Sequence, residues 1–222
     1  MSIGTIGLTA GSATSGSTIS FTHSVSPAAT AGNFCLVVMP TKEGAAGSVT
    51  ALTCNGTALT RVDIRGQGVT TAGAEMWTLA GAHSGTIAVT FSANMDNIQA
   101  PALSLLNVNQ STPTDSSNTA YSAGNTTLNV NVTSAAGKQV IDIIAVNSDG
   151  ALTVGAGQTQ LFQQNVDGSG GHIAGVSIEN GAGTTAMSWT WTGTRAAAMV
   201  GASFVTDDYV YVSPGGAQIL II

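Results

Sequence analysis

The stretch that decides the fold is Gly183-Thr184-Thr185-Ala186-Met187-Ser188-Trp189-Thr190-Trp191. Its large apolar residues alternate with small or polar ones, which is the period expected of a β-strand with one buried face. Three further segments show the same period, namely Ile19 to Phe21, Ile87 to Phe91 and Leu128 to Val132. No stretch keeps a helical period over three turns. We therefore predict an all-β protein.

Two continuous apolar runs indicate a second kind of strand. Phe34–Met39 and Val140–Val146 are apolar at nearly every position, which is typical of central strands that are buried on both faces. Asn55-Gly56, Asp149-Gly150 and Asp167-Gly168 predict turns between strands.

These segments recur in the same order, which indicates an internal repeat. An alternating strand precedes each continuous run, and the alternating strands Gly85–Phe91 and Gly183–Trp191 each precede an Ala-rich strand, Ala100–Leu106 or Ala196–Phe204. The pseudo-repeats span about residues 17–106 and 126–205. Because neither repeat is expected to cover its own apolar face, we predict one two-sheet antiparallel sandwich, with jelly-roll-like connections.

We expect this sandwich to form one domain over residues 1–205. The spacing of the repeats also fits two small domains, although no Pro-rich or charged linker divides them.

Residues 206–222 form a C-terminal extension, either an arm or an extra strand. Tyr209-Val210-Tyr211-Val212 precedes the break Ser213-Pro214-Gly215-Gly216, and the sequence then ends with Ile219-Leu220-Ile221-Ile222. An exposed Ile-Leu-Ile-Ile segment would favour aggregation. We therefore expect it to be buried, either in a sheet of the same chain or against another subunit. The candidate interface residues are Tyr209, Tyr211, Ile219, Leu220, Ile221 and Ile222.

The composition indicates a surface that other molecules cover. Charged residues make up 7% of the chain, against about 25% in an average protein. Ser, Thr, Asn and Gln hydrate the surface instead, and burying neutral hydroxyls costs less than burying ions. The net charge of −6 with only five Lys and Arg residues argues against nucleic acid as a partner.

The sequence also bears on location. It lacks an apolar segment long enough for a membrane span. Its first residues lack the basic and apolar regions of a secretion signal, so we expect synthesis in the cytosol. Cys35 and Cys54 are then expected to be thiols, although a disulfide between them is open if they face each other.

Candidate chemical groups are scattered. His23 shares the strand parity of Ile19 and Phe21, which predicts a core or interface position, and His83 and His172 lie near loops without the spacing of metal ligands. Gly168-Ser169-Gly170-Gly171-His172 comes nearest to a nucleophile turn but lacks its strand-to-helix context. We interpret it as a loop.

The acidic and aromatic residues do not indicate an active site either. Asp207 and Asp208 are adjacent, so a strand would direct them to opposite faces, and Asp96-Asn97 is expected to be a capped turn rather than a calcium ligand. Trp77, Trp189 and Trp191 could stack on sugars, but their pattern favours a core face. We expect no catalytic residue, no cofactor and no metal site, and therefore no enzyme.

Four segments resemble a β-sandwich module of tailed-phage virion proteins and bacterial surface proteins. They are Cys54–Thr60, Ala74–Leu79, Ser84–Phe91 and Asn107–Asp115, and the resemblance spans about residues 17–205. It implies a sandwich scaffold without a defined catalytic site, so no functional residue is carried over. Bacterial surface versions usually sit in secreted multidomain chains. The expected lack of a signal here favours a virion part.

The leading hypothesis is therefore a structural virion protein of a tailed phage, most simply a capsid decoration or cement subunit. Its partners would be the major capsid protein or other virion proteins and further copies of itself, and its location the virion. The alternative is a tail-tip, fibre or surface adhesin module that binds a glycan or a host protein. A polysaccharide lyase or esterase ranks below both.

Overall fold

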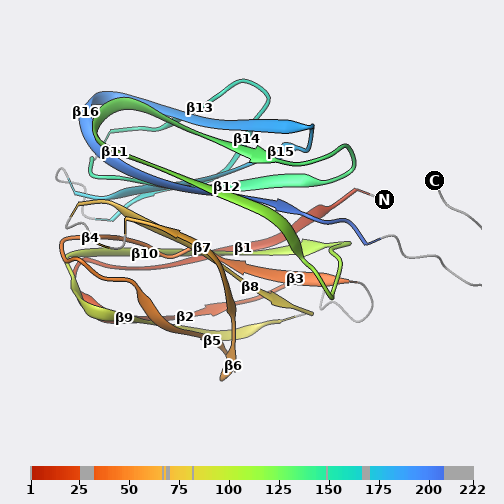
Figure 1. Cartoon of the computed structure of the whole chain (residues 1–222). Helices are drawn as coiled ribbons and strands as arrows, with labels where there is room; N and C mark the ends of the chain where they lie inside the picture. The colour runs from red at the N-terminus through yellow and green to blue at the C-terminus, as the bar shows by residue number, and fades with distance from the viewer. Residues whose placement is uncertain are drawn as a thin grey trace, which may run out of the picture.

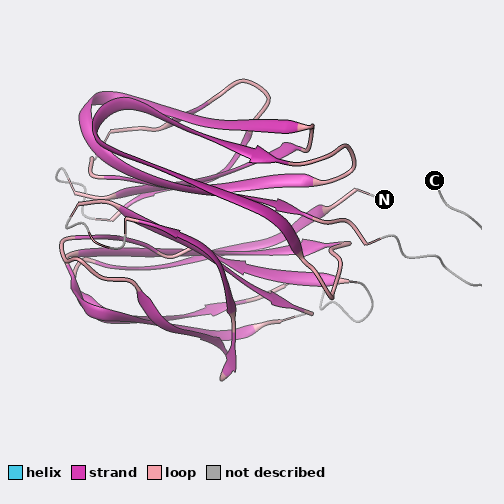
Figure 2. Cartoon of the chain, in the orientation of Figure 1, coloured by secondary structure: helices cyan, strands magenta, loops and turns pink. Residues whose placement is uncertain are grey.

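The computed structural model describes residues 2–25, 33–66, 68, 71–81, 83–148, 150–166 and 171–207. Within these residues every regular element is a β-strand and no helix occurs (Figure 2). The predicted all-β class is confirmed. The described part of the chain accordingly has no helix that could cross a membrane.

The first half of the chain forms two antiparallel sheets. The inner sheet has the order β1-β10-β3-β8-β4, with β7 paired to β8, and the outer sheet has the order β2-β9-β5-β6. Their strands are β1 (Gly4–Ala13), β2 (Gly16–His23), β3 (Phe34–Val38), β4 (Thr41–Glu43), β5 (Val49–Cys54), β6 (Thr57–Ala58), β7 (Thr60–Arg65), β8 (Gly73–Ala80), β9 (Gly85–Met95) and β10 (Asn97–Leu106).

The second half forms one sheet that folds back on itself. Its order is β11-β16-β12-β15-β14, with β13 paired to β16. Its strands are β11 (Thr114–Thr133), β12 (Gln139–Val146), β13 (Thr153–Val154), β14 (Thr159–Asn165), β15 (Ile173–Asn180) and β16 (Thr184–Phe204).

The fold-back lies in the middle of the two long strands. The pairing of β11 with β16 is irregular between Ser122 and Thr127. On one side of this irregularity the pair continues the sheet of β12, and on the other side it turns over that sheet as a separate layer with β13 (Figure 1).

The two halves pair their strands in the same way, which confirms the predicted duplication. In the outer layers, β2 corresponds to the folded-over part of β11, β9 to that of β16, and β5 to β13. In the inner sheets, β1 and β10 correspond to the remaining parts of β11 and β16, and β3, β8 and β7 correspond to β12, β15 and β14. Even a bulge is shared, because β7 shifts register between Arg61 and Asp63 and β14 between Gln160 and Phe162. The breaks after β1 and β9 in the first half are absent from the second, where single strands run through.

The antiparallel sandwich is as expected, but its layering differs from two sheets. One apolar cluster, which includes Leu52 and Val89, lies between the two sheets of the first half, and a second, which includes Val130 and Trp189, lies inside the second half. Each half therefore covers one of its own apolar faces. The physical reason lies in β3 and β12, which are apolar on both faces and need cover on both.

A third cluster joins the halves. Cys35 and Val37 of β3 share it with Ile141 and Ile143 of β12, as does Met39 directly after β3, and all five side chains are buried. The two inner sheets thus pack face to face, and the result is a block of four layers (Figure 1).

The halves use equivalent surfaces for this contact. β7 lies against β11 and β16, and its counterpart β14 places Leu161 beside Leu103 and β1. Polar contacts close the layer at one end, where the Gln99 Nε2 donates to the carbonyl oxygens of Gln164 (2.7 Å) and His172 (3.2 Å). The arrangement is that of a two-fold dimer within one chain.

Candidate functional site

The described surface is almost free of charge. Among the described residues, the exposed ionisable ones are Arg61, Arg65, Asp96, Asp115 and Arg195. Leu8 is the exposed large hydrophobic residue in the same part of the chain.

Both outer faces of the block carry hydroxyl and amide groups. On the outer sheet of the first half, Thr18, Ser20 and Thr22 of β2 are exposed, and Thr18 and Thr22 pair with Thr90 and Thr86 of β9. On the opposite face, exposed Thr127, Asn129, Asn131 and Thr133 of β11 pair with Thr190, Ser188, Ala186 and Thr184 of β16. Each face can therefore be covered without removing an ion from water.

A cleft of about 680 Å³ lies at the junction of the two halves. One wall consists of residues 60–62 of β7 and 78–80 of β8. The other consists of residues 110–117, which connect the halves and begin β11. Half of the lining side chains carry hydroxyl groups, with Val62, Leu79 and Pro113 between them. A volume in this range is typical of ligand sites, and so is its place between two units.

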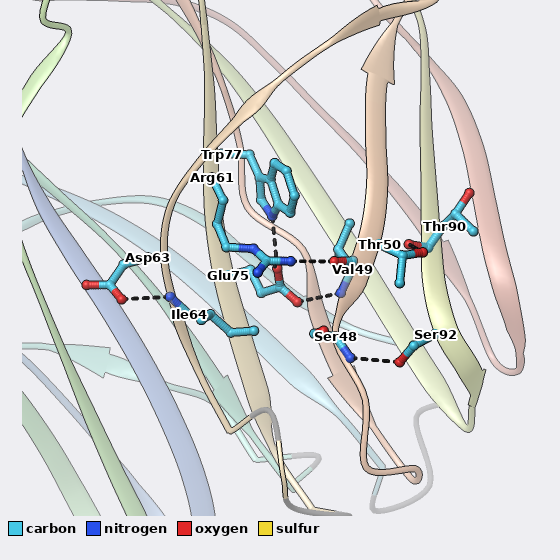
Figure 3. Close-up of polar contacts among 10 residues, drawn as sticks. All are labelled: Ser48, Val49, Thr50, Arg61, Asp63, Ile64, Glu75, Trp77, Thr90 and Ser92. Carbon is cyan, nitrogen blue, oxygen red and sulfur yellow. Dashed lines mark hydrogen bonds and ion pairs between the residues drawn. The ribbon is translucent and has the colours of Figure 1, made fainter.

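Arg61 stands on the wall of this cleft and is held by three groups. Its Nε lies 3.1 Å from Glu75 Oε2, its guanidinium donates to the Val49 carbonyl oxygen, and the guanidinium carbon lies 4.6 Å from the centre of the Trp77 ring (Figure 3). This stacked and paired geometry is one that a lysine could not reproduce.

Glu75 is the centre of the cluster. Its Oε1 accepts from the Val49 backbone N–H (2.6 Å), and its Oε2 accepts from the Trp77 indole N–H (3.0 Å). Burial raises the pKa of Glu75, and the hydrogen bonds and the Arg61 charge oppose that rise. Because both carboxylate oxygens are engaged, the group acts as a cross-link between β5, β7 and β8 that fixes Arg61 at the cleft.

The second half contains a buried carboxylate of its own. Asp142 Oδ1 accepts from the backbone N–H (3.0 Å) and the hydroxyl (2.7 Å) of Ser177, and Oδ2 accepts from the Trp189 indole N–H (2.8 Å). Gln158 extends the network, since its Nε2 donates to the Ser177 hydroxyl (2.6 Å) and its Oε1 accepts from the Ser188 N–H (2.7 Å). Burial raises the pKa of Asp142 to about 7, and its hydrogen bonds counteract part of that effect.

The residues weighed from the sequence do not meet at one place. Trp77, Trp189 and Trp191 are buried, so the predicted core position is confirmed and they form no platform for sugars. His23 is also buried, as expected, between Thr9 Oγ1 (2.7 Å) and Ser104 Oγ (2.8 Å).

The other two histidines each have a hydrogen-bond partner, and that of His172 lies in the other half of the chain. The His83 Nε2 lies 2.7 Å from the Ala80 carbonyl oxygen, and the His172 Nε2 lies 2.8 Å from Thr41 Oγ1. Asp96 forms the turn between β9 and β10, and Asn97 donates to Glu43. The described residues contain no cluster of metal-ligating side chains.

Cys35 and Cys54 are both buried free thiols. They lie in different apolar clusters, and burial raises the pKa of Cys35 to about 12. The interface candidates Tyr209, Tyr211, Ile219, Leu220, Ile221 and Ile222 lie outside the described residues, as do Asp208 and residues 168–170 of the candidate nucleophile loop.

Sequence reasoning missed the two buried carboxylates. A signal was present for Asp142, because it is the one charged residue inside the apolar run Val140–Val146, and a buried charge needs partners. Glu75 gave a weaker signal, since its ion-pair partner Arg61 comes from another strand.

Comparisons of the chain with known protein families, with curated proteins and with solved structures each returned no match. The resemblance to a virion and surface-protein module therefore stays a prediction.

The two tryptophans of β16 offer a matched test of the Asp142 network. Both are buried, but the Trp191 indole N–H has no hydrogen-bond partner among the described residues. We expect Trp189→Phe to lower the free energy of unfolding at pH 7 by about 1–3 kcal/mol more than Trp191→Phe, because it leaves a buried carboxyl oxygen without its donor. Urea denaturation of both variants measures the difference. Equal losses would contradict the network.

The raised pKa of Asp142 makes stability depend on pH. Between the ordinary value of 3.8 and about 7, the folded chain keeps a proton that the unfolded chain has released, so the free energy of unfolding falls as pH rises. Asp142→Asn removes this contribution. We expect the difference in unfolding free energy, wild type minus variant, to fall by a few kcal/mol from pH 4 to pH 7, at about 1.4 kcal/mol per pKa unit.

Urea denaturation at a series of pH values measures this difference, and the other titrating groups, including His23 and Glu75, are common to both proteins. Curves that run parallel from pH 4 to pH 7 would show that Asp142 titrates as an ordinary carboxyl.

Proposed function

We propose that this chain is a structural subunit of a larger assembly, and more specifically a decoration or cement protein on the capsid of a tailed phage. The observation that carries the proposal is the pair of neutral outer faces, on which Thr, Ser and Asn side chains replace the usual charges. Covering such faces costs little desolvation free energy, because neutral hydroxyl and amide groups can exchange hydrogen bonds to water for hydrogen bonds to a partner.

The mechanism is adhesion by many similar contacts. The four-layer block presents its faces on a rigid strand scaffold, and ionisable groups such as Glu75 and Asp142 are kept inside with their partners. Small contacts repeated over a shell of identical sites add up through multivalency. The virion assignment itself rests on the sequence resemblance, and the surface supports the broader assembly role.

A second candidate is an adhesin module at a tail tip or cell surface. The 680 Å³ cleft favours it, because its hydroxyl-rich walls suit a polar ligand. The tryptophans are buried and cannot stack on a sugar, so a protein ligand fits this candidate better than a glycan.

Co-sedimentation with capsids, combined with gel filtration, tests the proposal. Ser20→Lys and Asn129→Lys each place a charge on one outer face, while Ser20→Asn and Asn129→Ser keep it neutral. We expect one lysine variant to lose at least about tenfold in capsid affinity, that is about 1.4 kcal/mol, and its neutral counterpart to bind normally. Deletion of residues 213–222 is expected to abolish binding.

Wild-type protein that fails to sediment with capsids would overturn the capsid assignment. Normal capsid binding by both lysine variants would show that the outer faces do not contact the capsid. Normal binding without residues 213–222 would show that the C-terminal segment does not contribute.

A further inference from the structure

The edge of β7 is open where it lines the cleft. Among the described strands β7 pairs only with β8. Near its far end, the Ile64 N–H is satisfied by Asp63 Oδ1 (2.8 Å), and Asp63 Oδ2 accepts from the Ser117 hydroxyl (2.8 Å), which closes the cleft. Residues 60–62 have no such cover and form a cleft wall. A free strand edge is a template for another strand.

The last described residues run away from this cleft. The Asn109 N–H donates to the Val205 carbonyl oxygen, Val108 bridges Thr206, and the Asp207 N–H donates to the Asn107 carbonyl oxygen. The chain therefore passes from residue 109 toward residue 107, whereas the cleft begins at residue 110. The described chain therefore ends at Asp207 while heading away from its own cleft, which makes a second molecule the more direct acceptor of the residues that follow.

The sequence of residues 209–212 suits an added strand. Tyr209-Val210-Tyr211-Val212 alternates aromatic and β-branched residues without charge, and both types favour strands. Four residues of strand measure about 13 Å. Tyrosine combines an apolar ring with a hydroxyl, which matches walls in which Val62, Leu79 and Pro113 lie among hydroxyl groups.

We propose that the cleft beside β7 receives residues 209–212 of a second copy of this chain, which add to the open edge at residues 60–62 as an extended strand. Backbone hydrogen bonds to β7 supply affinity, and the alternating side chains supply specificity. Because the donated segment and the receiving cleft are different surfaces, the contact is head to tail and generates rings or open chains of copies. The inference deepens the proposed assembly role by naming one partner.

Two variants separate the donor from the acceptor. A chain that ends at Asp207 keeps the cleft and lacks the segment, and Thr60→Trp fills the cleft and keeps the segment. Thr159→Trp is the matched control, because Thr159 of β14 is exposed and pairs with Ile178 as Thr60 pairs with the equivalent Thr78. Circular dichroism first establishes that each variant is folded.

Light scattering then gives the masses. We expect wild type and Thr159→Trp to form multiples of 22.0 kDa, and the truncated chain and Thr60→Trp each to stay monomeric. Their mixture should stop at a one-to-one pair, since it has one working segment and one working cleft. A monomeric wild type, assembly by either impaired variant alone or a mixture without pairs would each overturn the proposal.

Hydrogen exchange identifies the site of contact. Amides of residues 60–62 should exchange more slowly in the wild-type assembly than in the truncated chain, while residues 159–161 should not differ. Slowed exchange in a monomeric wild type would place the segment in its own cleft and contradict donation. Capsid co-sedimentation of the same variants is read separately, so loss of self-association and loss of capsid binding are distinguishable.

Discussion

The apolar layer between the two inner sheets is the contact on which the rest of the molecule depends. β3 and β12 are apolar on both faces, and the outer layer of each half covers only one of them. Without the inner sheet of the other half, the second apolar face of each inner sheet would be open to water. At about 25 cal/mol per Å² of apolar surface, a face of this kind strongly favours pairing. The cleft follows from this pairing, because its two walls belong to different halves.

The two halves fill the same interior position in different ways. Glu75 of β8 corresponds in strand register to Gly175 of β15, and a side chain at Gly175 would meet the Trp189 ring at 2.8 Å. The indole thus occupies the space that the Glu75 side chain uses in the first half. Both solutions pair a buried carboxylate with an indole N–H and tie an inner sheet to its outer layer. The first one also delivers Arg61 to the cleft.

Much of the fold could be predicted from local pattern, and the layering could not. Each strand shows in its own sequence whether one face or both faces are buried. The alternation of Met187, Trp189 and Trp191 indicated one buried face, and the continuous run Val140–Val146 indicated two. The number of layers depends on which faces meet, and that is a property of the pairing between distant strands. The expectation that neither repeat covers its own face failed for this reason.

The candidate site was largely hidden from sequence analysis. Arg61, Glu75 and Trp77 are brought together by a β-bulge and strand pairing, and the opposite cleft wall comes from a connection about 50 residues later. The C-terminal segment could be singled out from its alternation of Tyr and Val, because that pattern is local. The acceptor proposed for it could not, since an open strand edge is visible only once the sheet order is known.

Native-state hydrogen exchange of Ile141→Ala tests the coupling of the halves most directly. Ile141 belongs to the second half but lies in the shared layer, and its truncation should cost about 2–4 kcal/mol. If the halves stabilise each other, the opening free energy of the β3 amides should fall by as much as that of the β12 amides. A loss confined to β12 and its neighbours in the second half would contradict the account.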